Sequence, residues 1–356
     1  TFTTAVERLI HRDRRFDDPL STLAFGTDAS FYRLIPQLVL RVESELEVVA
    51  LLKLANAERV PVTFRAAGTS LSGQAISDSV LIVLGDHWNR RDIRGNGHQI
   101  RVQPGVIGAQ ANAALAPFKR KIGPDPASIN AAKIGGIVAN NSSGMCCGTA
   151  QNTYHTLAGL RLVLADGTVL DSESSSSIAA FRASHGGLLE QLAELGRQTR
   201  ANLPLAGKIR HKYRLKNTTG FSINALIDFE DPLDILNHLM VGSEGTLGFI
   251  SAVTYDTVPD HPHKASALIV FPNVGTCCKA VPLLKQQPVA AVELLDRRSL
   301  RSVENMAGMP QWVRGLSAGA CALLIESRAA TGALLHEQLA QVMAAIAHFP
   351  VEKQVD

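Results

Sequence analysis

A loop of small and hydroxyl-bearing residues between two apolar runs is the feature that most limits how this chain can fold. The runs Val60–Phe64 and Val80–Leu84 have the length and continuous apolar character of buried strands. Between them, Arg65–Gln74 reads Arg-Ala-Ala-Gly-Thr-Ser-Leu-Ser-Gly-Gln. Glycine lets the backbone N–H groups of such a loop converge on an anion, and the hydroxyls add donors. The pattern predicts an anion-binding loop, with a solvated Gly/Ser loop as the alternative.

Two common nucleotide motifs do not fit this loop. A Walker loop ends in Gly-Lys followed by Ser or Thr, whereas this loop continues Gly73-Gln74-Ala75. The Rossmann fingerprint needs three glycines at a spacing that is not found here. ATP and NAD are therefore disfavoured, while another diphosphate-containing ligand stays open.

Two further segments are rich in small residues. Gly123–Pro126 is followed by Ile134–Gly144, which leaves little side-chain bulk over about ten positions. A backbone surface of this kind can lie flat against an extended ligand, and a tightly packed Gly/Ala turn is the alternative. In Val241–Ile250, three glycines, Ser243, Thr246 and Glu244 precede a predicted strand. Glu244 could accept hydrogen bonds from amides or a ligand hydroxyl, and a helix-to-strand turn is the alternative.

Composition restricts the class of protein. A chain of 356 residues favours two domains, and 46% hydrophobic with 19% charged residues is typical of a globular protein. The net charge of +3 indicates neither a nucleic-acid partner nor a polybasic membrane anchor. No apolar run reaches the roughly 18 residues of a transmembrane segment. Five cysteines without a Cys-x-x-Cys spacing predict reduced thiols, a cytosolic compartment and no metal site.

Periodicity places the main elements. We expect a Ser-rich surface loop over Ser172–Ser177 and a Pro- and His-rich linker over 259–264, after which a βαβ-type alternation restarts. The predicted helices are 45–58, 107–115, 188–201, 274–285 and 333–347. The other predicted strands are 99–104, 156–164, 265–271, 289–295 and 320–327.

Taken in order, the three segments resemble the FAD-binding domain of the vanillyl-alcohol oxidase, or p-cresol methylhydroxylase, type. The resemblance runs from Tyr32–Pro36 to Ile250, and Gly242–Gly248 is its most specific element. Asn217–Phe221 resembles the Asn-Thr-Gly-Tyr step of the family, with Phe221 in place of Tyr. The match is closest to the branch that contains glycolate oxidase, D-lactate dehydrogenase and D-2-hydroxyglutarate dehydrogenase. It implies an α+β fold, with a two-subdomain FAD-binding domain over residues 1–258 and a partial α+β cap domain over 265–356.

The resemblance also implies which residues hold FAD. Arg65–Gln74 would bind the pyrophosphate, Gly135–Gly144 the diphosphate and the flavin, and Glu244–Ile250 the adenosine and ribityl side. Some relatives attach the flavin through a His in the first loop, where this chain has Thr69 and Ser70, so noncovalent FAD is expected. The expected cofactor-binding residues are Arg65, Ala67, Gly68, Thr69, Ser70, Leu71, Gly73, Gln74, Pro124, Asp125, Gly135, Gly136, Asn140, Ser142, Ser143, Gly144, Glu244, Gly245 and Ile250.

The function implied by the resemblance is oxidation of a small D-2-hydroxy acid, of the lactate, glycolate or 2-hydroxyglutarate class, with hydride transfer to flavin N5. A cation must hold the substrate carboxylate. Arg210, Lys216 and Asn217 are the substrate candidates, and a solvated loop is the alternative for this charged run. The family's Gly-Asp-Gly-Asn-x-His segment does not occur in the sequence, so no catalytic base or metal ligand is assigned. A noncatalytic FAD-holding fragment, or an alcohol or sugar oxidase on the same flavin domain, are the alternative functions.

The two ends indicate a fragment. The sequence lacks an initiator Met, Thr1–Arg15 is too charged for a signal peptide, and the last residues carry no capping signal. The run Arg210–Lys216 resembles very large bacterial relatives that carry an iron–sulfur module after the flavoprotein part. We therefore expect electrons to pass to a quinone, a cytochrome or an iron–sulfur module. A cytoplasmic location is expected, either free or peripheral to the inner membrane.

Overall fold

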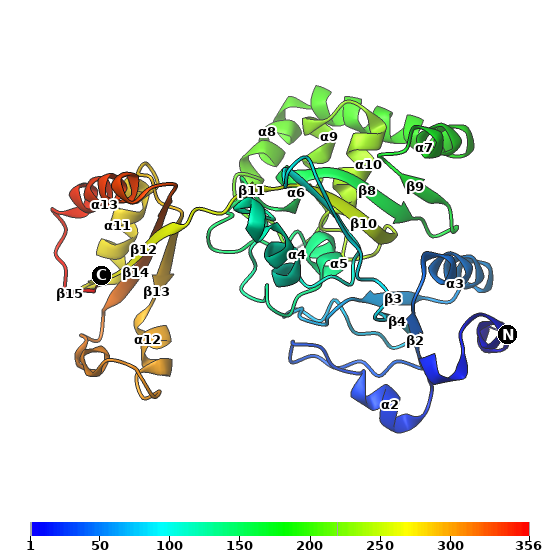
Figure 1. Cartoon of the computed structure of the whole chain (residues 1–356), viewed down its shortest axis with the longest axis horizontal. Coiled ribbons are helices and arrows are strands. Elements are labelled where there is room, and N and C mark those ends of the chain that lie inside the picture. Colours follow the sequence, from blue (N-terminus) through cyan, green and yellow to red (C-terminus); the bar gives the residue numbers. More distant parts are fainter. Residues whose placement is uncertain (1, 219, 356) are drawn as a thin grey trace. The chain divides into compact units, whose positions relative to one another are not determined.

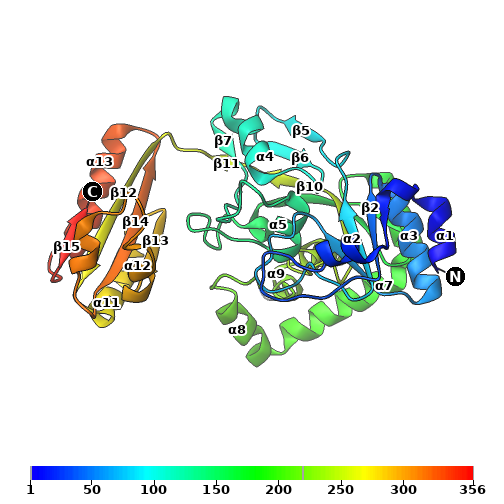
Figure 2. The same cartoon turned by 90° about the horizontal axis from the view of Figure 1, so that it is seen from below.

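Two sheets of different construction form the larger of two units in the computed structural model, residues 1–258 (Figures 1 and 2). The second unit comprises residues 259–356. The structure describes residues 2–218 and 220–355. Thr219, one residue of the predicted Asn217–Phe221 step, lies outside the described residues.

The first sheet is small and mostly parallel, and it defines the first lobe, residues 2–85. Its order is β1-β2-β4-β3, with β2, β4 and β3 parallel and β1 antiparallel. Alternate strand residues face opposite sides. Leu40 and Ile82 pack in the core that includes α1 and α3, whereas Leu81 packs near Phe16. The elements are α1 (Phe2–Leu9), β1 (Arg15–Phe16), α2 (Pro19–Ala24), β2 (Leu38–Val42), α3 (Glu45–Glu58), β3 (Val62–Arg65) and β4 (Val80–Leu84).

The bounds of α3 follow from its caps. Ser44 accepts a hydrogen bond from the Glu47 N–H at 3.3 Å, and two glutamates in the first turn favour the positive end of the helix dipole. Arg59 ends the helix in the left-handed conformation, with φ of 54°. The predicted helix 45–58 and the predicted strand 80–84 are therefore confirmed.

The second sheet is antiparallel and defines the second lobe, residues 86–258. Its order is β5-β6-β10-β8-β9. Helices α7, α9 and α10 lie on one side of it (Figure 1). The elements are β5 (Arg91–Arg94), β6 (Gln99–Val102), α4 (Gly108–Leu115), β7 (Arg120–Lys121), α5 (Ile134–Asn140), α6 (Thr153–Thr156), β8 (Leu157–Val163), β9 (Val169–Asp171), α7 (Ser175–Ala201), α8 (Leu203–Lys212), α9 (Ala225–Asp228), α10 (Pro232–Met240), β10 (Phe249–Asp256) and β11 (Val258–Pro259).

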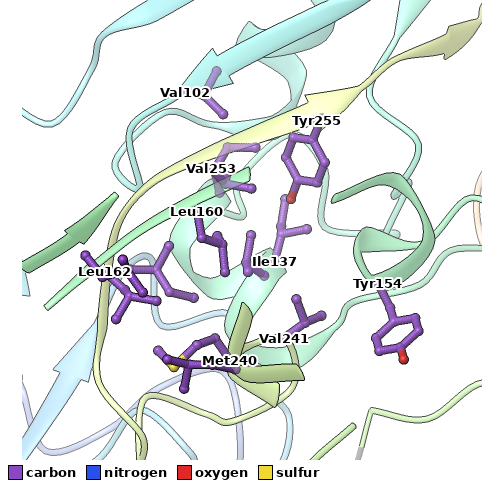
Figure 3. Close-up of a cluster of buried hydrophobic side chains, with 14 of the residues drawn as sticks. Val102, Ile137, Tyr154, Leu160, Leu162, Met240, Val241, Val253 and Tyr255 are labelled. Atoms are coloured by element: carbon purple, nitrogen blue, oxygen red, sulfur yellow. The ribbon is translucent and has the colours of Figure 1, made fainter. Parts of the chain in front are cut away.

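The core of the second lobe fixes the position of the short helix α5. Ile137 of α5 packs in one apolar cluster with Leu160 of β8 and Val253 of β10 (Figure 3). All three side chains are fully or almost fully buried. Because each buried aliphatic side chain contributes about 1.5–3 kcal/mol, this packing anchors α5 to the second sheet.

The opposite face of the second sheet is charged, and it joins the two lobes. Arg161 of β8 donates from Nε and Nη2 to the two carboxylate oxygens of Glu45, at 2.8 Å each. Arg161 also pairs with Asp171 at 3.2 Å. A two-point Arg–carboxylate pair has a fixed geometry. Since Glu45 begins α3 of the first lobe, this pair sets the orientation of one lobe against the other.

The Ser-rich stretch was predicted as a loop, and that prediction is wrong for its second half. Ser174 accepts a hydrogen bond from the Ser177 N–H at 3.3 Å, which caps the amino end of α7. Helix α7 therefore starts at Ser175 and not at 188, with one non-helical residue, His185, inside it. Serines are poor in helix interiors but favoured at caps.

The second unit is a four-stranded antiparallel sheet with helices. Its order is β13-β14-β12-β15, so β14 lies between the two strands that α11 connects. The predicted βαβ alternation is thus a split βαβ arrangement. The predicted linker is shorter than expected, because β12 begins at His263. The elements are β12 (His263–Phe271), α11 (Val274–Leu284), β13 (Ala291–Leu295), α12 (Arg297–Val303), β14 (Cys321–Ala329), α13 (Gly332–Ile346) and β15 (Lys353–Val355).

Within the described residues of both units, no helix has the length and apolar character needed to cross a bilayer.

Candidate functional site

A cavity of about 630 Å³ lies within the larger unit and is lined by both of its lobes. This volume falls in the range of small-molecule and cofactor sites. All three small-residue segments identified in the sequence contribute to its lining. The lining residues are Ala29, Phe64, Ala66, Gly68, Thr69, Ser70, Leu71, Ser72, Gln74, Ala75, Leu84, Pro104, Pro126, Ala127, Ser128, Ala132, Gly135, Gly136, Ile137, Ala139, Asn140, Ser142, Ser143, Thr218, Glu244, Gly245, Gly248, Phe249 and Ile250.

The first wall is the loop of residues 66–75, which follows β3 and is here called the phosphate loop after the role predicted for it from the sequence. Gly68 and Gly73 have φ of 69° and 76°, a region that side chains with a Cβ rarely adopt. Ser70 organises the turn, because its Oγ accepts hydrogen bonds from the N–H groups of Ser72 at 3.2 Å and Gln74 at 3.4 Å. The glycines and this serine therefore give the loop its shape.

Arg65 does not line the cavity, although the sequence placed it among the cofactor-binding residues. Its Nε donates to the Ala75 carbonyl at 2.7 Å, and its Nη2 donates to the Phe25 carbonyl at 3.0 Å. Burial lowers the pKa of Arg65, and the negative charge of Asp28 opposes that shift. The guanidinium is thus held by backbone carbonyls beneath the loop. Ala67 and Gly73 are likewise outside the lining.

The second wall is the glycine face of α5. A Cβ on Gly135 would lie 2.7 Å from the Pro104 Cβ, so this glycine allows close packing. A Cβ on Gly136 would lie at ordinary contact distance from the Ala66 Cβ, 3.7 Å, and Gly136 itself lines the cavity. Asn141 ends the helix in the left-handed conformation with φ of 53°. The two glycines therefore have different roles, one in packing and one in lining the cavity.

The third wall is the segment 244–250, which is tied to the end of α5. The Glu244 N–H donates to the Ala139 carbonyl at 2.9 Å, and the Asn140 Nδ2 donates to the Glu244 carboxylate at 2.7 Å. Ser142 Oγ in turn donates to the Asn140 Oδ1 at 2.9 Å. Burial raises the pKa of Glu244, while the bond from Asn140 acts in the opposite direction. Residues more than 100 positions apart thus form one polar wall.

The predicted residues Pro124, Asp125 and Gly144 lie behind the cavity and not in its lining. A Cβ on Gly144 would overlap the Asp125 carbonyl oxygen at 1.7 Å, so the two segments pack backbone to backbone. Asp125 Oδ1 also accepts a hydrogen bond from the Cys147 N–H at 3.1 Å. These residues support the wall, and their neighbours Pro126 and Ser143 face the cavity.

Comparison with protein-family models gives the family to which the chain belongs. A model described as an FAD binding domain matches residues 36–173, and a model described as the C-terminal domain of FAD linked oxidases matches residues 260–355. The chain belongs to the FAD-linked oxidoreductases of the p-cresol methylhydroxylase type. The predicted family, the α+β fold class and FAD as cofactor are thereby confirmed.

Curated relatives of this chain carry the names of hydroxy-acid enzymes. D-2-hydroxyglutarate dehydrogenase of Pantoea ananatis is 27% identical over 78% of this chain and 28% of its own length. The glycolate oxidase component GlcD of Escherichia coli is 37% identical over 79% of this chain and 47% of its own length. D-lactate dehydrogenase of Archaeoglobus fulgidus is 25% identical over 77% of this chain and 51% of its own length. The chain therefore spans between about a quarter and a half of these relatives.

Solved structures support the same fold. An alkyldihydroxyacetonephosphate synthase structure matches with a TM-score of 0.68 at 15% identity, over 100% of this chain and 62% of that one. The structure of BBE-like 1 of Physcomitrella patens matches with a TM-score of 0.63 at 12% identity, over 100% and 62%. At this identity the likeness concerns the fold alone.

The chemistry of the lining fits FAD. The walls offer backbone N–H groups at glycine turns, the hydroxyls of Thr69 and Ser72, and apolar surface at Phe64 and Ile137. The hydroxyls of Ser70, Ser142 and Ser143 also line the cavity, but they donate to Gln74, Asn140 and Asn141. No Lys, Arg or His occurs among the described lining residues, and Glu244 is their single charged member. A diphosphate here would be bound by amides and hydroxyls, as in other backbone anion cradles.

The predicted substrate residues are not brought into the cavity. Arg210 lies on α8 and is exposed, and Lys216 donates its Nζ hydrogen bond to the Gly144 carbonyl. Asn217 is buried, and its Nδ2 donates to the Gly220 carbonyl at 3.3 Å. Thr218, the next residue, does line the cavity. Asn217 itself therefore stays outside the lining and only precedes Thr218 in the chain.

Sequence reasoning missed several lining residues because they carry no motif. Ala29 comes from the segment before the first predicted strand, Pro104 from the turn after β6, and Thr218 from the turn after α8. Pro104-Gly105 was identified as the end of a strand but not as part of the site. The Asn-Thr step at 217–218 was the one available signal for Thr218.

Proposed function

We propose that residues 1–258 bind FAD noncovalently in this cavity and that the chain is the flavin part of an enzyme that oxidises a small D-2-hydroxy acid to the 2-oxo acid. Residues 265–356 would be the partial cap domain. The observation that carries the proposal is the cavity itself, which three glycine-rich segments build inside a chain that matches FAD-linked oxidase models. The names of the curated relatives indicate the lactate, glycolate or 2-hydroxyglutarate class of acid.

The geometry supports a division of roles along the cavity. The phosphate loop, with Gly68 and Thr69, would receive the diphosphate through amides and a hydroxyl. The face of α5 at Gly136 lines the cavity without a side chain and would lie against the flavin. Glu244, held by Asn140, would accept hydrogen bonds from the hydroxyls of the ribityl or ribose groups. Noncovalent binding is supported because no His or Cys is found among the described lining residues.

FAD supplies the hydride-accepting chemistry when it is bound. The contribution of this chain is to hold the ring in a fixed orientation and to exclude water from the walls that Phe64, Ile137 and Phe249 line. A carboxylate-holding cation would have to come from outside the lining. Of the three predicted candidates, Lys216 donates to the Gly144 carbonyl behind the wall, and Asn217 directly precedes the lining residue Thr218.

A second function is favoured by the absence of cations and His from the described lining. A chain that holds FAD without oxidising substrate would need neither a carboxylate-binding cation nor a base. An alcohol or sugar oxidase on the same flavin domain would not need the cation either. For the catalytic proposal, a quinone, a cytochrome or an iron–sulfur module is the proposed electron acceptor, and the cytoplasm the proposed location.

The test starts from the purified chain and two matched substitutions. Gly136→Leu fills the cavity side of α5, whereas Gly187→Leu is placed on an exposed part of α7 with nothing within 4 Å of its Cβ. Both exchange a helical glycine for a good helix former, so neither should reduce stability by more than about 1 kcal/mol. We expect Gly136→Leu to weaken FAD binding at least about 100-fold, equivalent to about 2.8 kcal/mol. Gly187→Leu should bind FAD like the wild type.

Anaerobic addition of D-lactate, glycolate or D-2-hydroxyglutarate to the FAD-loaded chain separates the functions. Bleaching of the visible flavin absorbance by one of these acids supports the oxidase. Bound flavin that none of the acids bleaches, but that an alcohol or sugar does, supports the alcohol or sugar oxidase. Flavin that no substrate bleaches supports the FAD-holding fragment. A wild-type chain without affinity for FAD, or full FAD affinity in Gly136→Leu, contradicts the site.

A further inference from the structure

The phosphate loop is backed by a second segment, residues 25–35, here called the strap. The strap is closed by a hydrogen bond from the Leu34 N–H to the Gly26 carbonyl at 3.1 Å and by a bridge between Thr27 and Arg33. It is attached to the loop by the Ala29 N–H, which donates to the Gly68 carbonyl at 2.9 Å. The strap thus lies against the loop at the glycine that turns it.

Arg65 joins the loop and the strap at a second place. Its planar guanidinium donates from Nε to the Ala75 carbonyl at 2.7 Å and from Nη2 to the Phe25 carbonyl at 3.0 Å. Since Arg65 ends β3 and Ala75 is the last residue of the loop, the first of these bonds closes the loop between its two ends. The second bond fixes the start of the strap.

Asp28 completes this arrangement from the strap side. Its Oδ1 accepts from the Ser30 N–H at 2.8 Å, and its Oδ2 accepts from the Ala75 N–H at 3.4 Å. Both backbone groups of Ala75 are therefore bound, the carbonyl by Arg65 and the amide by Asp28. A Cβ on Gly68 would lie 3.5 Å from the Arg65 Cδ and 3.8 Å from the Asp28 Cβ. The two side chains sit under the loop, while Gly68 and Ala75 line the cavity.

We propose that Arg65 and Asp28 are positioning residues, which hold the phosphate loop in its binding shape without contacting the cofactor. This inference rests on the proposed FAD site. The loop has two glycines at positive φ, so a loop without support would populate many other shapes. Binding would then have to order it, at a cost in affinity. A salt bridge from Arg65 to the diphosphate is the competing interpretation, and the two make opposite predictions.

The decisive variant is Asp28→Ala. If electrostatics dominates, removal of a negative charge near an anionic cofactor tightens FAD binding. If Asp28 positions the loop, the same substitution weakens FAD binding, by about tenfold for the loss of two hydrogen bonds. Arg65→Gln should weaken binding by a similar or larger factor in either case. Arg65→Lys should recover part of it, because an ammonium can reach one of the two carbonyls but cannot match the planar pair.

A general loss of stability must be separated from a specific effect on the loop. Arg14→Gln is the matched control, because Arg14 pairs with Glu47 at 2.8 Å in the same lobe and lies outside the cavity lining. We expect Arg14→Gln to shift urea unfolding but not the FAD dissociation constant. Arg65→Gln and Asp28→Ala should raise that constant and also speed proteolytic cleavage within residues 25–35 of the FAD-free chain.

FAD dissociation constants of all variants are measured by fluorescence titration at several NaCl concentrations. If the FAD dissociation constant of Arg65→Gln depends on salt as strongly as that of the wild type, the positioning role is supported, because backbone amides then still make the contact with the diphosphate. Tighter binding in Asp28→Ala, or a clearly reduced salt dependence in Arg65→Gln, overturns it. An Arg65→Gln variant that unfolds at lower urea but binds FAD like the wild type, as expected of Arg14→Gln, also overturns it. A wild-type chain that binds no FAD contradicts the proposed function itself, which distinguishes the two failures.

Discussion

Replacement of Asn141 tests how the end of α5 is held. Asn141 is 4% exposed and ends the helix at φ of 53°. Its Oδ1 accepts from the Tyr154 N–H at 3.2 Å, and its Nδ2 donates to the Asn217 carbonyl at 3.4 Å. One side chain therefore connects α5, α6 and Asn217, the residue before Thr218 of the lining.

The magnitude follows from two separable losses. Asn141→Ala leaves the buried Tyr154 N–H and the Asn217 carbonyl without this partner, which costs about 2 kcal/mol. It also places a Cβ-bearing residue without a local hydrogen bond in the left-handed region, which costs about 1 kcal/mol. The expected loss of unfolding free energy is about 3 kcal/mol. Asn141→Gly suffers the first loss but not the second, so about 2 kcal/mol is expected.

The assay is urea unfolding monitored by tryptophan fluorescence. The chain has two tryptophans, and Trp312 lies in the second unit, so a Trp312→Phe background leaves Trp88 as the reporter of the larger unit. Trp88 is 2% exposed and donates to the Val42 carbonyl at 2.9 Å, which makes its emission sensitive to unfolding. Equal stability of the Ala and Gly variants would contradict the conformational argument. Wild-type stability in both would contradict the hydrogen-bond argument.

Four other substitutions, at three positions, test separate parts of the larger unit. Gly68→Val, at φ of 69°, should distort the phosphate loop and abolish measurable FAD binding while far-ultraviolet circular dichroism stays unchanged; retained FAD affinity would refute the loop assignment. Because burial raises the pKa of Glu244 above its ordinary 4.5, the folded chain holds that proton more tightly than the unfolded chain. The free energy of unfolding should therefore fall as the pH rises from that value through the raised pKa. Urea titrations at stepped pH should show this fall in the wild type and a smaller one in Glu244→Gln. Equal pH dependence of the unfolding free energy in the two proteins would contradict the prediction. Glu244→Ala should also weaken FAD binding without unfolding the chain, and unchanged affinity would remove Glu244 from the site. Tyr154→Phe removes the 2.8 Å hydrogen bond to Asp228 and should lower the free energy of unfolding by about 1–2 kcal/mol. Because Tyr154 lies outside the cavity lining, FAD affinity should not change, and weaker FAD binding at unchanged stability would contradict that placement.

The sequence determined the parts of this protein that depend on short-range patterns. The helix at 45–58 and the strand at 80–84 follow from an apolar period and from residues at their own ends. The three small-residue segments mark where backbone must come close to a ligand or to other backbone, whatever surrounds them. The family follows from those segments in order. FAD as cofactor was therefore predictable from the chain alone.

The tertiary structure decided which of these residues face the cavity. Arg65 is next to a glycine-rich loop in the sequence, but its guanidinium turns under the loop to the Ala75 and Phe25 carbonyls. Gly144 belongs to the right segment but packs against Asp125. A local pattern contains no information on partners that are 10 to 40 positions away.

Local sequence patterns also did not predict the hydrogen bond between Asn140 and Glu244, which are 104 positions apart. Each residue belongs to a motif that was visible in the sequence, but their hydrogen bond depends on the packing of α5 against the second sheet. The serines at 172–177 show the limit at short range, because the same residues favour loops and helix caps. The sequence by itself determined the pieces and the cofactor, and the long-range packing of buried segments decided which atoms form the site.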